Sequence, residues 1–167
     1  ADHGEYNLAI ADFDTMIRLD PRNAEGYRER GLTYYQMGDY DRAIADSSEA
    51  IRLDPKFACA FQDRGNAYYM KGKYGLGIAD YNEALRLTPK DVMTYENRAH
   101  AYFAMKKYDE AIADYSEIIR LKPSNAQAFS ERADAYRKKG DYASERSDCK
   151  DAARLDPKFA NNPCASE

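Results

Sequence analysis

Apolar and polar positions alternate along the chain with the period of an α-helix. In residues 24–57, Tyr27, Gly31 and Tyr34 recur at spacings of four and three, so they share one helix face. Gly38 follows at a place that suits the left-handed residue after a helix. A second stripe has the same spacing and ends before Pro55, which disfavours a helical residue in front of it: Tyr40, Ala43, Ile44, Ser47, Ala50 and Ile51. The pattern predicts two helices, each of about 14 residues and about 21 Å long.

The same pattern returns at a fixed interval along the chain, and five evenly spaced prolines mark this period: Pro21, Pro55, Pro89, Pro123 and Pro157. Four repeats align without a gap, over residues 24–57, 58–91, 92–125 and 126–159. Residues 1–23 match only the second helix of an incomplete repeat, and residues 160–167 form a C-terminal tail. One helix pair cannot bury its apolar face alone, so a fixed period of this size indicates a stacked array. We therefore expect nine helices in an all-α solenoid.

The aromatic residues support a packing role for the repeated positions. All 21 of them, 15 Tyr and 6 Phe, fall into six of the 34 positions of the repeat. Small residues such as Gly31 and Ala43 fill complementary positions, as close-packed helices require. Two departures are expected to weaken packing. Gly75 and Gly77 loosen the start of one helix, and Glu145 replaces the small residue of the last repeat.

A polar periodicity accompanies the apolar one. Arginine recurs at 30, 64, 98 and 132, and aspartate at 12, 46, 80, 114 and 148. Each Asp precedes the next Arg at one constant spacing, from Asp12 and Arg30 onward. We expect a ladder of Arg–Asp pairs that joins the second helix of one repeat to the first helix of the next. The alternative is a row of solvated charges that contributes little.

Composition and charge exclude several classes of function. The net charge is −4, and no repeat concentrates positive charge, so nucleic acid is not an expected partner. No apolar run reaches the ~18 residues of a membrane span, and the N-terminus shows no signal peptide. The three cysteines, Cys59, Cys149 and Cys164, do not indicate a disulfide framework or a zinc motif. Unpaired thiols would favour a reducing compartment such as the cytoplasm, although the compartment stays undetermined.

Catalytic and cofactor chemistry have no candidate in the sequence. Residues 72–77, with three glycines and Lys73, lack the spacing of a phosphate-binding loop and lie on the turn that every repeat shares. His100 is one of two histidines and is either a ligand contact or a solvent-facing helix residue. No carboxylate pair stands apart from the repeat pattern. We expect no enzyme, no metal site and no cofactor.

The repeat resembles the tetratricopeptide repeat (TPR) family. The resemblance rests on six positions and their equivalents over residues 1–159: Tyr27, Gly31, Tyr34, Ala43, Ala50 and Pro55. It implies antiparallel helix pairs in a right-handed superhelix with a concave groove. Members of this family typically bind peptide segments or partner helices in the groove and are rarely enzymes. The resemblance therefore implies a non-catalytic protein–protein interaction scaffold.

The groove positions that the family implies lie on the first helix of each repeat. On these helices Tyr35, Tyr69 and Phe103 form an aromatic stripe. The stripe is a candidate surface for peptide binding, or else its rings are partly buried against the inner helices. The candidate contacts carry both charge signs, which favours an amphipathic ligand: Arg28, Tyr35, Asn66, Tyr69, His100, Phe103, Asp134 and Arg137. A subset of the family binds chaperone C-terminal carboxylates through a basic clamp, but Leu32, Glu96 and His100 depart from that clamp. Glu96 would repel a carboxylate, which disfavours a co-chaperone function.

Two further interpretations stay open. The chain begins within a repeat, so Leu8, Ile10 and Phe13 would lack a covering helix. Such an apolar end would favour a homo-oligomer formed through the exposed ends. The chain could also be the interaction segment of a larger multidomain protein.

Overall fold

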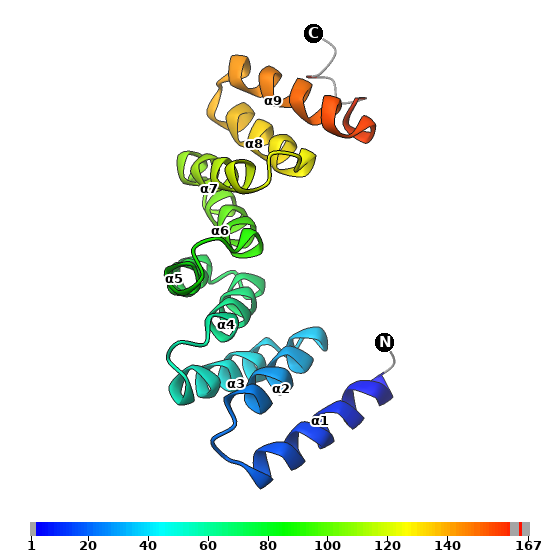
Figure 1. Cartoon of the computed structure of the whole chain (residues 1–167), viewed down its shortest axis with the longest axis vertical. Helices are drawn as coiled ribbons and strands as arrows, with labels where there is room; N and C mark the ends of the chain where they lie inside the picture. Colours follow the sequence, from blue (N-terminus) through cyan, green and yellow to red (C-terminus); the bar gives the residue numbers. More distant parts are fainter. Residues whose placement is uncertain (1–2, 161–163, 165–167) are drawn as a thin grey trace. The chain divides into compact units, whose positions relative to one another are not determined.

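The computed structural model describes residues 3–160 and 164, and within them it contains nine α-helices, one 3₁₀ turn and no strand. The chain divides into two compact units, Ala1–Pro89 and Lys90–Glu167. The first contains α1 (His3–Leu19), α2 (Ala24–Gln36), α3 (Tyr40–Leu53), α4 (Ala58–Met70) and α5 (Tyr74–Leu87), as Figure 1 shows from blue to green. The second contains α6 (Val92–Ala104), α7 (Tyr108–Leu121), α8 (Ala126–Lys139), α9 (Tyr142–Leu155) and the turn η1 (Pro157–Phe159). The all-α prediction is confirmed.

The helices end where the sequence predicts. Gly38, Gly72 and Gly140 each follow the first helix of a pair and have positive φ angles of 81°, 69° and 88°. In the third repeat Lys106 takes the equivalent place at φ 60°, so the turn is kept without glycine. Asp54 before Pro55 is extended and ends α3, as expected from the geometry of a residue before proline.

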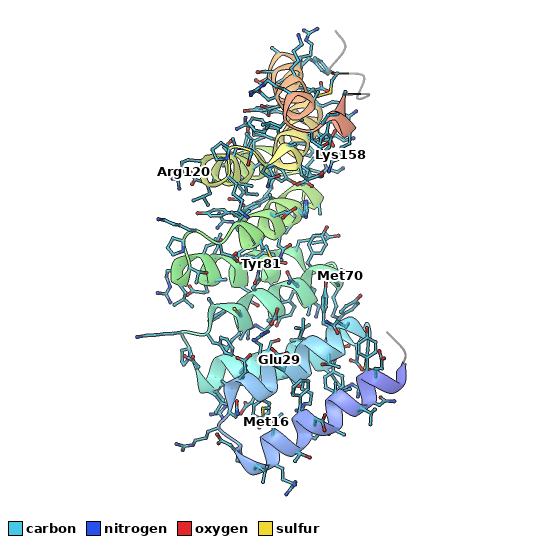
Figure 2. All side chains as sticks on the ribbon, turned by 45° about the vertical axis from the view of Figure 1, so that its right-hand side comes forward. Met16, Glu29, Met70, Tyr81, Arg120 and Lys158 are labelled. Carbon is cyan, nitrogen blue, oxygen red and sulfur yellow. A yellow bond between two sulfur atoms is a disulfide. The ribbon has the colours of Figure 1, made fainter. Side chains whose placement is uncertain are left out.

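The core of each unit consists of small residues packed against tyrosines. Tyr81 is 1% exposed and Tyr115 is 2% exposed. Tyr81 is a residue of α5, and its ring lies against Gly65 of α4 (Figure 2). A Cβ on Gly65 would lie 2.7 Å from Cε1 of Tyr81, and one on Gly77 would lie 3.0 Å from the carbonyl oxygen of Gly65. Gly77 therefore lets α4 and α5 approach closely, which is not the loosening role expected of it from the sequence.

The last repeat keeps its charged residue inside the helix pair. Glu145, which replaces a small residue, is 9% exposed. Its Oε1 lies 3.8 Å from Nε of Arg137 on α8. The carboxylate is thus accommodated between α8 and α9, where looser packing was expected from the sequence.

The Arg–Asp pairs exist, but the predicted partners are wrong. Arg30 donates two hydrogen bonds to Asp46, which follows it in the same repeat: one from Nε at 2.8 Å and one from Nη2 at 2.7 Å. The same pairing, in which Nε and Nη2 of one arginine donate to one carboxylate, recurs in each of the three following repeats: Arg64 with Asp80, Arg98 with Asp114, and Arg132 with Asp148. Each pair joins the two helices of one repeat. We call Arg30, Arg64, Arg98 and Arg132 the clamp arginines.

The link to the preceding repeat uses a different partner. In Arg30, Arg64 and Arg132 the remaining guanidinium nitrogen, Nη1, donates to an acceptor on another helix. Nη1 of Arg30 donates to Asp14 at 2.5 Å, that of Arg64 to Ser48 at 3.1 Å, and that of Arg132 to Ser116 at 2.8 Å. These acceptors lie on the second helix of the repeat that precedes each arginine. Arg30, Arg64 and Arg132 therefore each link three helices, their own and the two neighbouring helices that carry the acceptors.

The cysteines also differ from expectation. Cys149 on α9 forms a disulfide with Cys164, with their Cα atoms 5.9 Å apart, while Cys59 is a free, exposed thiol. The prediction that the cysteines are unpaired is therefore wrong for two of the three. No spacing signal indicates this pair, since Cys164 lies beyond η1 and only the packing of η1 on α9 brings that part of the chain near Cys149. The inclination toward a reducing compartment loses its basis.

Across the part of the chain that the structure describes, no helix combines the length and the apolar character needed to cross a bilayer.

Candidate functional site: the faces of the first helices

In the first unit, the candidate groove residues lie on α2 and α4. Tyr35 and Tyr69 stand near the C-terminal ends of these helices, and both are half-buried. Met70, which follows Tyr69, is 48% exposed (Figure 2). Together these side chains place apolar surface at the ends of two neighbouring helices that contact one another.

The aromatic stripe has a repeated local structure. The ring of Tyr35 lies 5.5 Å from that of Tyr40, and the ring of Tyr69 lies 5.3 Å from that of Tyr74. In the second unit, Phe103 packs on Tyr108 in the same way at 5.3 Å. Each ring of the stripe is thus held by the first tyrosine of the following helix. The two interpretations of the stripe are compatible, because a half-buried ring is oriented by its neighbour and still has accessible surface.

Arg28 is more enclosed than a simple groove contact. Its side chain is 17% exposed and lies 3.2 Å from Asp63 on α4, 2.6 Å from Glu29 and 3.3 Å from Glu25. Burial raises the pKa of Asp63 to about 6, even though Arg28 favours its ionised form. Because three carboxylates already neutralise the guanidinium, Arg28 holds α2 and α4 together and offers little free charge to a ligand.

Asn66 is also engaged within the protein. Its Oδ1 accepts a hydrogen bond of 2.8 Å from the hydroxyl of Tyr81. Burial raises the pKa of Tyr81, so the hydroxyl stays protonated and donates. Asn66 therefore connects the face of α4 to the core.

In the second unit, Asp134 and Arg137 lie one turn apart on α8. They form a pair of 2.6 Å, and their side chains are 50% and 55% exposed. Of the charged candidates these two are the more accessible, and either could exchange its partner for a charge on a ligand. A surface pair of this kind contributes little to stability.

His100 is part of a polar cluster between α6 and α8. Its Nε2 lies 3.2 Å from Oε2 of Glu131, whose other oxygen accepts a 2.9 Å hydrogen bond from Gln127. The hydrogen bond with Glu131 raises the pKa of His100, against the opposite effect of burial. Burial acts to raise the pKa of Glu131, but the hydrogen bonds from His100 and Gln127 lower it overall. His100 is thus a partly buried partner of Glu131, and its side chain keeps 38% of its surface exposed.

Glu96 completes this cluster, although it was not among the site residues predicted from the sequence. Ligand atoms of Glu96, His100 and Glu131 all lie within 4.8 Å of one another. Glu96 and His100 are four positions apart on one helix, so they share a face, and that spacing was a usable signal. Glu131 lies on a later helix, and only the packing of α8 on α6 brings it to the cluster.

A surface hollow in the first unit lies elsewhere. It measures about 370 Å³ and is formed at the turn between α2 and α3, with the Lys71–Asp41 ion pair at its rim: Met37, Gly38, Asp39, Tyr40, Asp41, Arg42 and Lys71. None of the candidate groove residues lines it.

Helix pairs at a fixed period, closed by left-handed turns and joined by arginines, define a helix-pair repeat protein of the α-solenoid class. The chain belongs to the tetratricopeptide-repeat family. A model described as TPR repeat matches residues 1–38, 31–72, 65–106 and 99–140, and one described as tetratricopeptide repeat matches residues 126–159. The resemblance expected from the sequence is confirmed.

Solved structures extend the comparison. The crystal structure of MamA is 27% identical, covers 94% of this chain and 92% of its own, and has a TM-score of 0.88. The first TPR of Spaghetti (RPAP3), bound to the HSP90 peptide SRMEEVD, is 29% identical over 72% of this chain and 96% of its own, with a TM-score of 0.69. YrrB, a TPR protein with an unusual peptide-binding site, is 20% identical over 94% and 82%, with a TM-score of 0.81. A comparison with curated proteins gives no match.

Proposed function

We propose that this protein is a non-catalytic scaffold that binds an extended peptide or a partner helix on the faces of its first helices. The observation that carries the proposal is the repeated ring pair of Tyr35, Tyr69 and Phe103, each fixed by the tyrosine that begins the next helix. A ring that is already oriented loses little entropy on binding, and aromatic anchors supply much of the affinity of peptide interfaces. Peptide binding by the similar structures of YrrB and RPAP3 supports the same interpretation.

The charges indicate the chemistry of the ligand. Asp134 and Arg137 are about half exposed and offer both signs, whereas Arg28 is already paired with three carboxylates. We therefore expect an amphipathic ligand whose apolar side chains contact the rings. A segment that ends in several carboxylates would meet Glu96 and Glu131 with few free cations, so the peptide class bound by the RPAP3 repeat is not the expected one.

Affinity capture tests the proposal. The wild type is compared with a variant that combines Tyr35→Ala, Tyr69→Ala and Phe103→Ala, and bound proteins are identified by mass spectrometry. Tyr142→Ala is the matched control, because Tyr142 is 62% exposed and begins a second helix. We expect the triple variant to lose partners that the wild type and the control retain. Recovery of the same partners by all three would contradict binding through the rings.

A second function has support from α1. Leu8 and Leu19 are 70% and 73% exposed on this helix, and Met16 is 39% exposed, which is the apolar surface expected of a self-association site. If it mediates assembly, light scattering should show an oligomer that Leu8→Lys with Leu19→Lys converts to a monomer. A monomeric wild type at high concentration would exclude this function.

A further inference from the structure

Three side chains with metal-ligating atoms converge between α6 and α8. Glu96 and His100 stand one helical turn apart on α6, and Glu131 reaches them from α8. Their ligand atoms lie within 4.8 Å of one another, and all three side chains are half-buried. The cluster is thus reachable from solvent but is held by packed helices.

The spacing of the ligand atoms suits a small divalent ion. Two ligands at about 2.0–2.2 Å from a tetrahedral ion stand about 3.4 Å apart. Nε2 of His100 and Oε2 of Glu131 are already 3.2 Å apart. A carboxylate oxygen of Glu96 lies within 4.8 Å of both other ligands, so rotation of this side chain can bring it to the same centre.

The surroundings hold the cluster in place and leave negative charge to be neutralised. Gln127 donates to Oε1 of Glu131, and the hydroxyl of buried Tyr115 also hydrogen-bonds this carboxylate. Such outer contacts orient metal ligands. Glu96 forms no ion pair with a lysine or arginine among the described residues. With neutral histidine the cluster carries two negative charges, which a divalent cation would balance.

We propose that Glu96, His100 and Glu131 form a binding site for a divalent transition-metal ion such as Zn²⁺. One imidazole nitrogen and two carboxylates are a donor set that zinc accepts, whereas Ca²⁺ and Mg²⁺ prefer oxygen ligands alone. Three protein ligands leave a coordination position for water. The proposal does not depend on the proposed peptide binding, since it rests on side chains of α6 and α8 alone.

Calorimetric titration with ZnCl₂ at about pH 7.5, without reductant, tests the site, because histidine binds a metal in its neutral form. All proteins carry Cys59→Ser, because the exposed thiol of Cys59 would otherwise bind zinc. We expect one Zn²⁺ per chain, with the affinity reduced about tenfold or more by Glu96→Gln, His100→Gln or Glu131→Gln, since each variant removes one of three ligands. Glu96→Gln is the most informative variant, because no ion pair to a lysine or arginine is lost with it.

Two matched controls and a second readout complete the experiment. His3→Gln replaces the other histidine, and Glu83→Gln replaces an exposed glutamate paired with Arg86; both should bind zinc like the parent. In NMR spectra, Zn²⁺ should shift the ring signals of His100 at one equivalent and leave those of His3 unchanged. Circular-dichroism spectra establish that every variant is helical. Unchanged affinity in folded Glu96→Gln and His100→Gln, or an equal effect of His3→Gln, would overturn the proposal.

Discussion

At the scale of the single residue, each clamp arginine places a guanidinium beside a buried aspartate. Asp80 is 7% exposed and receives two hydrogen bonds from Arg64, whose side chain is 21% exposed. Two-bond pairs of this geometry are specific as well as favourable. Removing one partner leaves the other charge buried without compensation, which costs more than the pair itself contributes.

Arg64→Met is therefore expected to lower the free energy of unfolding by about 3 kcal/mol, which corresponds to several degrees in Tm. Arg86→Met is the matched control, because Arg86 pairs with Glu83 on the surface at 63% exposure and such pairs contribute at most about 1 kcal/mol. Thermal melts followed by circular dichroism measure both. Equal Tm values for the two variants would show that the clamp pairs behave as solvated charges.

Asp63 makes stability depend on pH. Its pKa is raised from 3.8 to about 6 in the folded protein, so between these values the folded state binds more protons than the unfolded state. The contribution of Asp63 to stability is then lost as the pH rises through this window. We expect Asp63→Asn, which keeps an acceptor for Arg28, to reduce the loss of stability between about pH 4 and pH 7 by roughly 1–2 kcal/mol. Urea unfolding of both proteins at these pH values measures the difference, and parallel pH profiles would contradict it.

The clamp residues were predictable from the sequence, but their partners were not. Along the sequence, each repeated aspartate from Asp46 to Asp114 lies between two repeated arginines. Asp46, for example, is separated from Arg30 and from Arg64 by nearly equal numbers of residues. Both distances are compatible with antiparallel helices, and only the way the helices pack selects the arginine that precedes the aspartate. The same limit applied to Glu131, whose position in the cluster depends on contact between α6 and α8.

At the scale of the element, helix ends were predictable and helix contacts were not. Gly38, Gly72 and Gly140 are left-handed for a local reason, and the sequence pattern indicates it. Gly65 and Gly77 cannot be told from these turn glycines by residue type, but their role is different: the absence of a side chain lets α4 and α5 approach closely. Gly75 lies on the same helix as Gly77, but a Cβ there would meet nothing within 4 Å.

Substitutions of two glycines separate these roles. Gly65→Ala should lower Tm, because its Cβ would lie 2.7 Å and 2.9 Å from ring carbons of buried Tyr81, and overpacking of this kind costs about 1–3 kcal/mol. Gly75→Ala should raise the free energy of unfolding by up to about 1 kcal/mol, since alanine favours the helix. Denaturant unfolding of the two variants measures both signs. A stabilising Gly65→Ala would show that α4 and α5 separate at little cost.

At the scale of the whole molecule, stability comes from neighbouring elements in contact, as expected of a repeat array. Each of the two compact units has its own packed helix pairs. The disulfide adds a covalent link in the second unit, where Cys149 on α9 is 1% exposed and is joined to Cys164.

Cys164→Ser should lower the stability of the second unit. The two cysteines are separated by 15 positions, and for a loop of this size the loss of chain entropy in the unfolded state corresponds to about 3 kcal/mol. Calorimetry of the variant, and of the wild type with and without dithiothreitol, measures this effect. Reduction should reproduce the variant, and Cys59→Ser should match the wild type. No change in Tm on reduction would contradict a stabilising link.

The clamp arginines also bear on where one building block of this protein can be separated from the next. The proline period cuts the chain after each second helix, but Arg30 binds Asp14 on α1 as well as Asp46 on α3. The complete polar contact therefore spans a second helix and the whole of the pair that follows, which is one helix more than the sequence repeat. For recombination this means that an exchangeable cassette should be cut at the prolines, because a cut between the two helices of a pair would separate Arg30 from Asp46 and break both hydrogen bonds of that pair. A cassette cut at the prolines keeps each Arg–Asp pair and separates only the hydrogen bond from Nη1, so the preceding helix of the new neighbour must supply its Asp or Ser acceptor.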